Sequence, residues 1–442
     1  MRGLWAPRRQ TASSTVARIG WTVRLRAVGA PLAIKSYRRH VIARMLSWTG
    51  SAVSPIGLAF AVLHLGGGAT ALGLVLAAGM APQILLLLVG GVVADRWSRA
   101  SVMLWANVVS AVAEAAAAVL LLAGAAHVWH LVVMSALCGA AAAFFTPAAG
   151  GVVVEVVPVE MRHQANALLK VGQNVVKVAG PALGGVLVSA FGPSWVIGWD
   201  AVTFAVAALL CAHLGLKPTK AKIRSGFVRD LRQGWGDFAA RRWLWVMVLQ
   251  GAVVVPVWLV GYQMLGPVYG QHYLGGARPW GFVVSAFTAG LIVGAAVALV
   301  WRPSLVGLLV CGGTGSMALP LAAMALTAPV PVLAAATATA GTGLALSMTM
   351  WASLVQERIP SDRLSRVTSY STLGQLLPVP LGYLAAGPLA AVFGLRVTLG
   401  AGAVVIGAAM VAPLLLPQIR ALALAPVERS AAGAREEVTA AR

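Results

Sequence analysis

The chain has 442 residues, of which 59% are hydrophobic and only 10% are charged. A soluble protein carries about 25% charged residues, so this composition excludes a soluble globule, and the apolar content excludes a disordered chain. The 33 basic and 12 acidic residues give a formal net charge of +21. A charge of this size often indicates nucleic-acid binding. The positions of the basic residues along the chain decide whether that interpretation applies here.

Long apolar runs with few charges predict membrane-spanning helices of about 18–25 residues. Twelve such runs follow one another, and we expect spans over 41–64, 70–94, 101–124, 128–153, 166–190, 194–215, 243–265, 279–301, 304–327, 331–356, 367–391 and 396–417. The predicted fold is therefore an all-α integral membrane protein with twelve transmembrane helices.

The basic residues between these spans fall almost entirely on one side of the membrane. With the N-terminus inside, 29 of the 33 lie at the cytoplasmic side, two (Arg278 and Arg396) lie opposite, and Lys170 and Lys177 fall within the fifth span. Because cytoplasmic loops carry the excess of Lys and Arg, we expect both termini in the cytoplasm of a bacterial cell. The charge then reflects topology and contact with anionic lipid, and no nucleic-acid partner is expected.

The expected units are a basic N-terminal arm (1–40), a first six-helix bundle (41–215), a cytoplasmic linker (216–242), a second bundle (243–417) and a cytoplasmic tail (418–442). In the linker Phe227, Leu231, Trp235 and Phe238 recur at helical spacing. This pattern predicts an amphipathic helix, which lies either on the membrane surface or against the bundle.

A shift of 202 residues aligns the fourth and fifth predicted spans with the tenth and eleventh. Ten of the 40 positions from 153 to 192 are then identical, including Glu155 with Glu357 and Gln173 with Gln375. Six spans separate the copies, so both have the same orientation in the membrane. Parallel six-helix repeats are a transporter architecture, in which two similar halves rock about a cavity between them.

Two short motifs stand out in the first half. The turn after the second span contains Gly91, Asp95, Arg96 and Arg99, whose charges can pair with carboxylates or helix ends in one conformation and release them in another. An ordinary positively charged turn is the alternative.

The second motif lies in the fifth span, which contains Gly180, Pro181, Gly184 and Gly185. Proline kinks the helix and the glycines let neighbouring helices approach closely. A plain packing kink is the alternative to a special role.

From about Tyr37 to Pro417 these features resemble the major facilitator superfamily. The turn is similar to that superfamily's signature loop, and the glycine–proline run to the signature of drug–proton antiporters. The stretch from Phe145 to Phe204 resembles the enterobactin-exporter-like and macrolide-efflux-like branch.

The resemblance implies a gating role for Asp95, Arg96 and Arg99, with Glu155 as their acidic partner. It also places the fifth span at the interface between the two halves. Ser135 stands where many proton antiporters carry an intramembrane arginine, so the coupling scheme of those antiporters does not transfer directly.

Charged residues within a span cost about 2.5–3.5 kcal/mol each at the helix centre, so each is a candidate functional group. Glu114, Lys177 and Asp200 are such residues. We hypothesise that Glu114 couples transport to protons, and the alternative is a structural ion pair with Lys177. For Asp200 a structural role is favoured over coupling.

Polar residues within the spans can line a substrate cavity, and the candidates are Gln173, Asn174, Thr342 and Gln375. Hydrogen bonds between helices are the alternative for these residues. Tyr262, Tyr269, Tyr273 and Trp280 lie beside or within an expected outer loop, 266–278, and predict an interfacial aromatic belt.

The sequence therefore predicts a monomeric secondary transporter of the bacterial inner membrane. We expect it to export a small organic compound or drug by proton antiport through alternating access. A member that works by uptake or uniport, and a membrane-embedded receptor or scaffold, are the alternatives. The sequence has no Walker A motif, nucleophile motif or metal-ligand spacing, so we expect no enzyme activity, cofactor or metal.

Overall fold

The computed structural model describes residues 30–213, 241–301, 305–359 and 361–420. Within these ranges every regular element is a helix, and twelve spans are long and apolar enough to cross a membrane. The prediction of an all-α protein with twelve transmembrane spans is confirmed. Nearly all of the expected arm and tail, and the amphipathic helix of the linker, lie outside the described residues.

The first half contains six uninterrupted spans. They are α2 (Lys35–His64), α3 (Gly68–Arg96), α4 (Arg99–Leu122), α5 (Val128–Val156), α6 (Arg162–Phe191) and α7 (Pro193–Ala212), with the short turns η1 (Ala30–Ala33) and η2 (Val159–Met161). At 1.5 Å per residue even the 20-residue α7 is about 30 Å long, which matches the hydrocarbon thickness of a bilayer.

Three spans of the second half are interrupted. The elements are α9 (Arg242–Trp258), the π-helical turn η3 (Leu259–Met264), α10 (Leu265–Tyr273), α11 (Ala277–Val300), α12 (Val306–Gly315), α13 (Ala318–Ala325), α14 (Val330–Arg358), α15 (Ser361–Leu376), α16 (Val379–Phe393), α17 (Leu395–Leu414) and the short α18 (Pro417–Arg420). The expected outer loop 266–278 is wrong, because the span continues as a helix to Tyr273. Pro267 is tolerated there because it lies in the first turn of α10.

The bounds of the helices repeat with the same shift of 202 residues that was found in the sequence. α5 and α14 begin and end 202 residues apart, and so do α7 and α17. Gly192 before α7 has a φ of 87°, and Gly394 before α17 has a φ of 83°. Because L-residues with a side chain rarely adopt this conformation, the same turn requires glycine in both halves.

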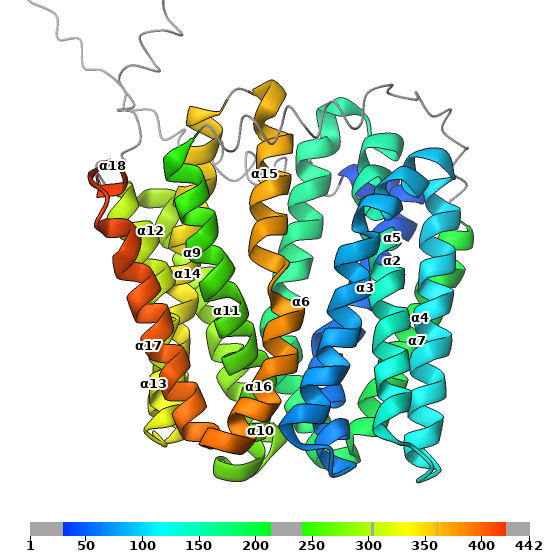
Figure 1. The fold of residues 1–442 in the computed structure, drawn as a ribbon. Coiled ribbons are helices and arrows are strands. Elements are labelled where there is room, and N and C mark those ends of the chain that lie inside the picture. The colour runs from blue at the N-terminus through cyan, green and yellow to red at the C-terminus, as the bar shows by residue number, and fades with distance from the viewer. Residues whose placement is uncertain (1–29, 214–240, 302–304, 360, 421–442) are drawn as a thin grey trace, which may run out of the picture.

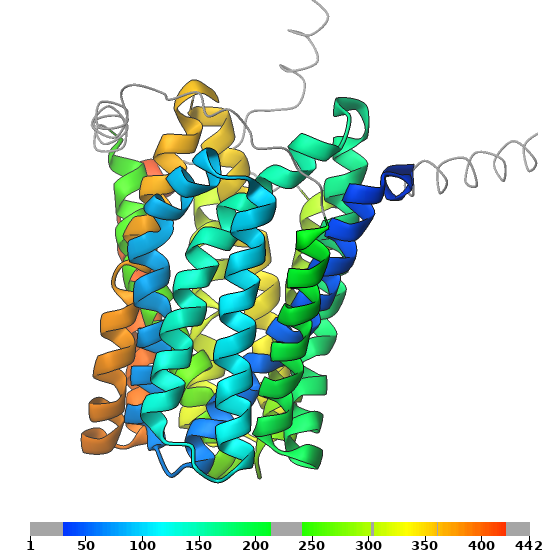
Figure 2. The same cartoon turned by 90° about the vertical axis from the view of Figure 1, so that its right-hand side faces the viewer.

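The two halves lie side by side, with α2 to α7 on one side and α9 to α17 on the other, and both ends of the described chain lie at the same end of the molecule (Figures 1 and 2). The halves contact each other mainly where α6 packs on α11 and where α16 packs on α3. A Cβ on Gly185 of α6 would lie 3.1 Å from Gly281 Cα, and one on Gly387 of α16 would overlap the backbone of Thr70.

These two close approaches lie at the end of the molecule opposite to the chain termini. α2 starts at the end with the termini and crosses to the opposite end, where α3 begins. Thr70 lies in the first turn of α3 and therefore at that opposite end. Gly185 and Gly387 are themselves 202 residues apart. The contact that closes this end is therefore built twice, from the same glycine of each repeat.

The outer surface of the bundle is apolar. Leu85, Leu299 and Val300 are 73, 85 and 87% exposed. Contiguous exposed apolar surface of this kind marks a face covered by another phase, and in a multi-pass membrane protein the lipid chains cover it.

Candidate transport site

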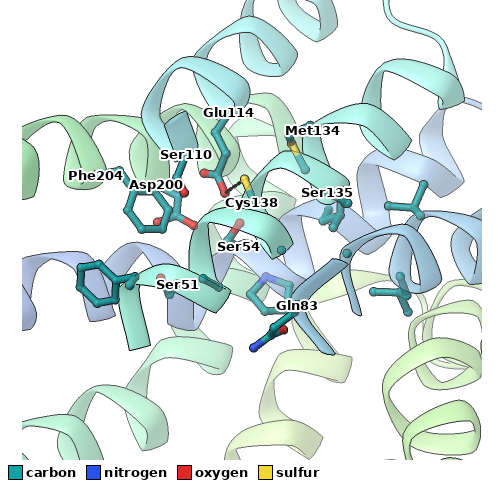
Figure 3. Close-up of a pocket in the computed structure, with 18 of the residues that line it drawn as sticks. Ser51, Ser54, Gln83, Ser110, Glu114, Met134, Ser135, Cys138, Asp200 and Phe204 are labelled. Carbon is teal, nitrogen blue, oxygen red and sulfur yellow. Dashed lines mark hydrogen bonds between the residues drawn. The ribbon is translucent and has the colours of Figure 1, made fainter. Parts of the chain in front are cut away.

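A cavity of about 440 Å³ lies within the first half, between α2, α3, α4, α5 and α7. The polar residues that line it are Ser51 and Ser54 of α2, Gln83 of α3, Asn107, Ser110 and Glu114 of α4, Ser135 and Cys138 of α5, Asp200 of α7 and Gln263 of η3 (Figure 3). Gln263 is the one lining residue that comes from the second half. The cavity is therefore built in one half and touched by the other.

Two carboxyl groups meet in this cavity. Glu114 is 5% exposed and Asp200 is 2% exposed, both line the cavity, and the two carboxyls lie close enough for their charges to interact. α4 and α7 pack along each other, which brings the two residues together (Figure 3). Sequence reasoning singled out both residues but did not predict that they lie together.

The hydrogen bonds around the pair are unequal. Asp200 Oδ1 accepts a hydrogen bond from Thr203 Oγ1 at 3.2 Å, and Ser54 lines the same cavity. Glu114 Oε1 accepts only a weak hydrogen bond from Cys138 Sγ at 3.9 Å. Glu114 Oε2 is buried and takes no hydrogen bond from any donor among the described residues. Asp200 is thus held by neighbours, whereas Glu114 is free to take a proton or a ligand.

α2 makes room for this pair through a glycine. A Cβ on Gly50 would overlap Asp200 Oδ1 and Thr203 Oγ1. The Asp200 carboxyl therefore lies directly over the backbone of α2, where any larger residue would displace it. Gly50 is a positioning residue that sequence reasoning missed, because glycine is common throughout these apolar helices.

The expected alternative, an ion pair between Glu114 and Lys177, is wrong. Lys177 is exposed on α6, and its nearest charged neighbour is Lys170. None of the described residues that line the cavity is Lys, Arg or His. Arg44 of α2 lies beside the cavity wall, with its guanidinium 4.5 Å from the ring centroid of Trp48 and 5.1 Å from that of the lining residue Phe145.

The predicted gate is described in part. Arg99 Nη1 donates a hydrogen bond to the Gly151 carbonyl and lies 3.9 Å from Glu155 Oε2. Arg99 at the start of α4 is therefore tied to the end of α5, and the structure contains the expected pairing with Glu155. Gly91, Asp95 and Arg96 lie in the last turns of α3, and their side chains are outside the described residues.

The glycine–proline motif of α6 faces two neighbours. Gly180 lies against Ala52 and Gly184 against Val53, so both pack on α2 within the first half. Gly185 lies against α11, and the Pro181 carbonyl lies against Gly281 of the same helix. The structure thus places this span at the interface between the halves, as the resemblance implied.

The four predicted cavity residues do not line this cavity. Thr342 Oγ1 donates to the Gly290 carbonyl at 3.1 Å, so Thr342 joins α14 to α11 as the alternative interpretation expected. Gln375 packs against Gly251 of α9, and Gln173 Oε1 lies 3.5 Å from Lys170 Nζ. Asn174 is half-buried on α6.

The predicted aromatic belt is wrong for three of its four residues. Tyr262, Tyr269 and Trp280 are 3, 1 and 2% exposed, and only Tyr273 is open, at 48%. The Trp258 and Tyr262 rings stack with centroids 4.4 Å apart, and the Tyr262 hydroxyl donates to the Val283 carbonyl at 3.3 Å. The π-helical turn and α10 continue the span, so these rings pack inside the bundle.

The cavity also contains small polar residues that no sequence pattern indicated as a site. Ser54, Ser110 and Cys138 come from three helices. Single Ser and Cys residues are frequent in transmembrane helices, where they bond to their own backbone. Only the packing of α2, α4 and α5 shows that these three face one cavity.

Twelve membrane-spanning helices in two similar halves are the architecture of a transporter. Residues 41–382 match the model of the Major Facilitator Superfamily, and the chain belongs to that superfamily. It is accordingly a transporter and not an enzyme.

Individual relatives are distant. The chain is 26% identical over 405 residues to the multidrug efflux pump Tap of Mycobacterium tuberculosis, which covers 87% of this chain and 94% of that protein. Tap of Mycobacterium bovis matches equally.

Solved structures share the fold at low identity. A crystal structure of a mutant of nucleoside transporter NupG superposes with a TM-score of 0.72 at 10% identity, covering 86% of this chain and 99% of that one. A bacterial homologue of the human lysosomal transporter Spinster, in an inward-facing and occupied conformation, superposes with a TM-score of 0.63 at 15% identity, covering 89% and 99%.

Proposed function

We propose that this transporter exports a small organic compound in exchange for protons, and that Glu114 is the coupling carboxylate. The observation that carries the proposal is that two buried carboxyls, those of Glu114 and Asp200, line the same cavity. Two carboxylates that share a buried site repel each other, so the pair favours a proton on one of its members. The site is thus built to hold a proton within the membrane.

Loss of that proton requires a compensating charge. Two carboxylates in contact repel each other strongly, and an unpaired charge inside a membrane protein is costly. Glu114 has the weaker set of hydrogen bonds, so it is the member of the pair that we assign to the proton. Asp200, held by Thr203, acts as its partner, which gives Asp200 more than the structural role favoured from sequence.

Alternating access is supported by the way the halves meet. The distribution of Lys and Arg favours both termini in the cytoplasm, and the glycine contacts then close the outer end. This conformation therefore faces inward. Opening the outer end requires Gly185 and Gly387 to separate from their partners, while the turn with Asp95, Arg96 and Arg99 acts near the inner end.

Export of drug-like compounds is favoured by the similarity to the efflux pump Tap. Membership of the enterobactin-exporter-like and macrolide-efflux-like branch stays a prediction, as do the bacterial inner membrane and the monomeric state. Uptake or uniport is the second candidate, and the same assay separates it from antiport.

The test uses inverted membrane vesicles that contain the full chain. We expect a proton gradient to drive accumulation of at least one of two dyes, uncharged Nile red or cationic ethidium, and an uncoupler to abolish it. Glu114→Gln should remove gradient-driven accumulation while leaving the protein in the membrane. Glu160→Gln, which changes an exposed carboxylate in η2, should have no effect.

Two results would contradict the proposal. Unchanged accumulation by the Glu114→Gln variant would exclude Glu114 as the coupling residue. Dye flux that ignores the uncoupler would favour uniport.

A further inference from the structure

We propose that the cavity binds an organic cation and that the Glu114–Asp200 pair holds the positive charge of that ligand in the place otherwise taken by the proton. The inference deepens the proposed function, because it names the charge class of the substrate at the same site. It also states why proton and substrate exclude each other.

Among the described residues that line the cavity, the only charged side chains are Glu114 of α4 and Asp200 of α7. α5 adds Cys138 beside the pair, and α2 and α3 add serine, glutamine and apolar side chains. Next to the lining, the Arg44 guanidinium of α2 lies on the rings of Trp48 and of Phe145, which itself lines the cavity, and His40 of the same helix is 1% exposed.

The described lining therefore contains no charge that balances the pair. When the pair is fully ionised, two negative charges face a cavity with no basic residue among its described lining residues. Burying such charges is costly unless an opposite charge enters. A ligand cation meets this requirement, whereas an anion would add to the repulsion.

A second polar group is also unpartnered in the cavity wall. Ser135 is 6% exposed, lines the cavity, and its Oγ has no hydrogen-bond partner among the described residues. Buried hydroxyls are nearly always hydrogen-bonded in a folded protein. Ser135 Oγ and Glu114 Oε2, from neighbouring helices, thus offer a ligand one hydroxyl and one carboxylate oxygen.

The remaining wall favours an organic ion over a metal ion. Leu58, Met134 and Phe204 line the cavity beside the polar residues, and the volume of about 440 Å³ falls within the range of about 300–1,000 Å³ of drug-sized pockets. Phe204 presents an aromatic ring, which attracts cations.

Binding in this cavity also reaches the other half. Gln263 lines the cavity from η3, and its side chain is exposed. A ligand that contacts both Gln263 and the carboxyl pair bridges the two halves. A bound ligand then shifts the equilibrium between the conformations in which the two ends of the transporter are open or closed.

The first test measures ligand charge with two ions of matched size. Tetraphenylphosphonium is a cation, and tetraphenylborate is an anion of the same shape. In calorimetry with the purified full chain we expect the cation alone to bind. Its affinity should rise as the pH rises from about 6 to about 8, and at the lower pH binding should release about one proton per ligand.

Variants then assign the binding to the pair. Glu114→Gln and Asp200→Asn should each weaken binding of tetraphenylphosphonium by about tenfold or more, since each removes one charge beside the ligand. Proton release should be lost in Glu114→Gln. The control Glu160→Gln should bind like the parent chain.

A labelling experiment needs no variant and so does not depend on variant folding. Dicyclohexylcarbodiimide modifies protonated carboxyls in membranes, and mass spectrometry locates the adduct. We expect adducts on Glu114 or Asp200, slowed by tetraphenylphosphonium and unaffected by tetraphenylborate.

Three outcomes would overturn the inference. They are equal binding of the anion, cation binding that is unchanged by both substitutions, and labelling that the cation does not slow. These failures are distinct from failure of the proposed function. Gradient-driven transport of Nile red without cation binding would contradict the cationic ligand and leave proton antiport standing. Cation binding together with dye flux that is insensitive to the uncoupler would contradict proton antiport and leave the cationic ligand standing.

Discussion

The two halves of the transporter contain hollows of similar size and opposite character. The cavity of the first half has a volume of about 440 Å³ and contains two carboxyls. A groove in the second half, about 470 Å³, is lined by described residues of α9, η3, α10, α13, α16 and α17, and Thr398 is the one hydroxyl-bearing residue among them. Asp200 in the first half corresponds to Gly402 in the second, 202 residues further on, and Thr203 corresponds to Val405. Gly402 and Val405 both line the groove.

The positions around these spaces are matched as well. Pro55 and Pro256 each line one of them, and Gly50 and Gly251 stand five residues before these prolines. The backbone of the two halves is thus alike where the spaces form. A few side chains give one half a buried acid pair and leave the other half apolar, so the chemistry is confined to one copy of a repeated scaffold.

The largest effect is expected from placing a carboxylate in the second half. Gly402→Asp buries an acid with no partner in the apolar groove, which costs about 2.5–3.5 kcal/mol at a helix centre. We expect little folded protein, measured by yield and melting temperature in detergent. In the control Gly402→Ala the Cβ would lie 3.0 Å from Leu321 Cδ2, which needs only a small shift. Normal stability of the Asp variant would show that the groove is not apolar in the membrane.

The next effect concerns the feature that both halves share. Gly185→Val and Gly387→Val each place a side chain against backbone of the opposite half, and such overpacking costs about 1–3 kcal/mol. Because the contact is two-fold, we expect both variants to slow gradient-driven dye transport to a similar degree. Gly407→Val is the control, since no described atom beyond its chain neighbours and the adjacent backbone of its own helix lies within 4 Å of its Cβ position. Loss in only one of the two variants would contradict a symmetric closure.

A smaller effect compares one matched glycine in each half. Gly50→Ala should displace the Asp200 carboxyl and lower transport by about tenfold, as misplaced catalytic groups do. In Gly251→Ala the new Cβ would lie 2.7 Å from Gln375 Cγ and Cδ, atoms of a flexible side chain that can move aside. We expect this second variant to transport normally. Equal losses would mean that packing on α2 and α9, and not the carboxyl, determines the result.

The smallest effect on stability is expected at the gate. Arg99 and Glu155 are 3.9 Å apart and 23 and 22% exposed, and such pairs contribute about 0–1 kcal/mol. Glu155→Gln should therefore leave the melting temperature nearly unchanged while altering the transport rate, with Glu160→Gln as the control. A large drop in melting temperature with an unchanged rate would assign the pair to structure.

The sequence predicts the fold more completely than the site. Apolar runs locate spans because each must cross the same hydrocarbon layer, and all twelve are present. The prediction failed at 266–278, where a loop was expected between two apolar runs but a π-helical turn carries the helix onward to Tyr273. The prediction that Thr342 lines a cavity also failed. The sequence shows a hydroxyl within a span, but it does not show whether that hydroxyl faces a cavity or a neighbouring helix.

The amino-acid sequence by itself determined the class of protein. Hydrophobic runs, the one-sided distribution of Lys and Arg, and the 202-residue repeat are properties of chain order, and each follows from partition between water and lipid. Only the tertiary structure decided that Glu114 meets Asp200, that Gly50 makes room for them, and that Ser135 lines the same cavity. Those contacts depend on which faces of α2, α4, α5 and α7 pack together, and in an all-apolar helix no periodic pattern records that choice.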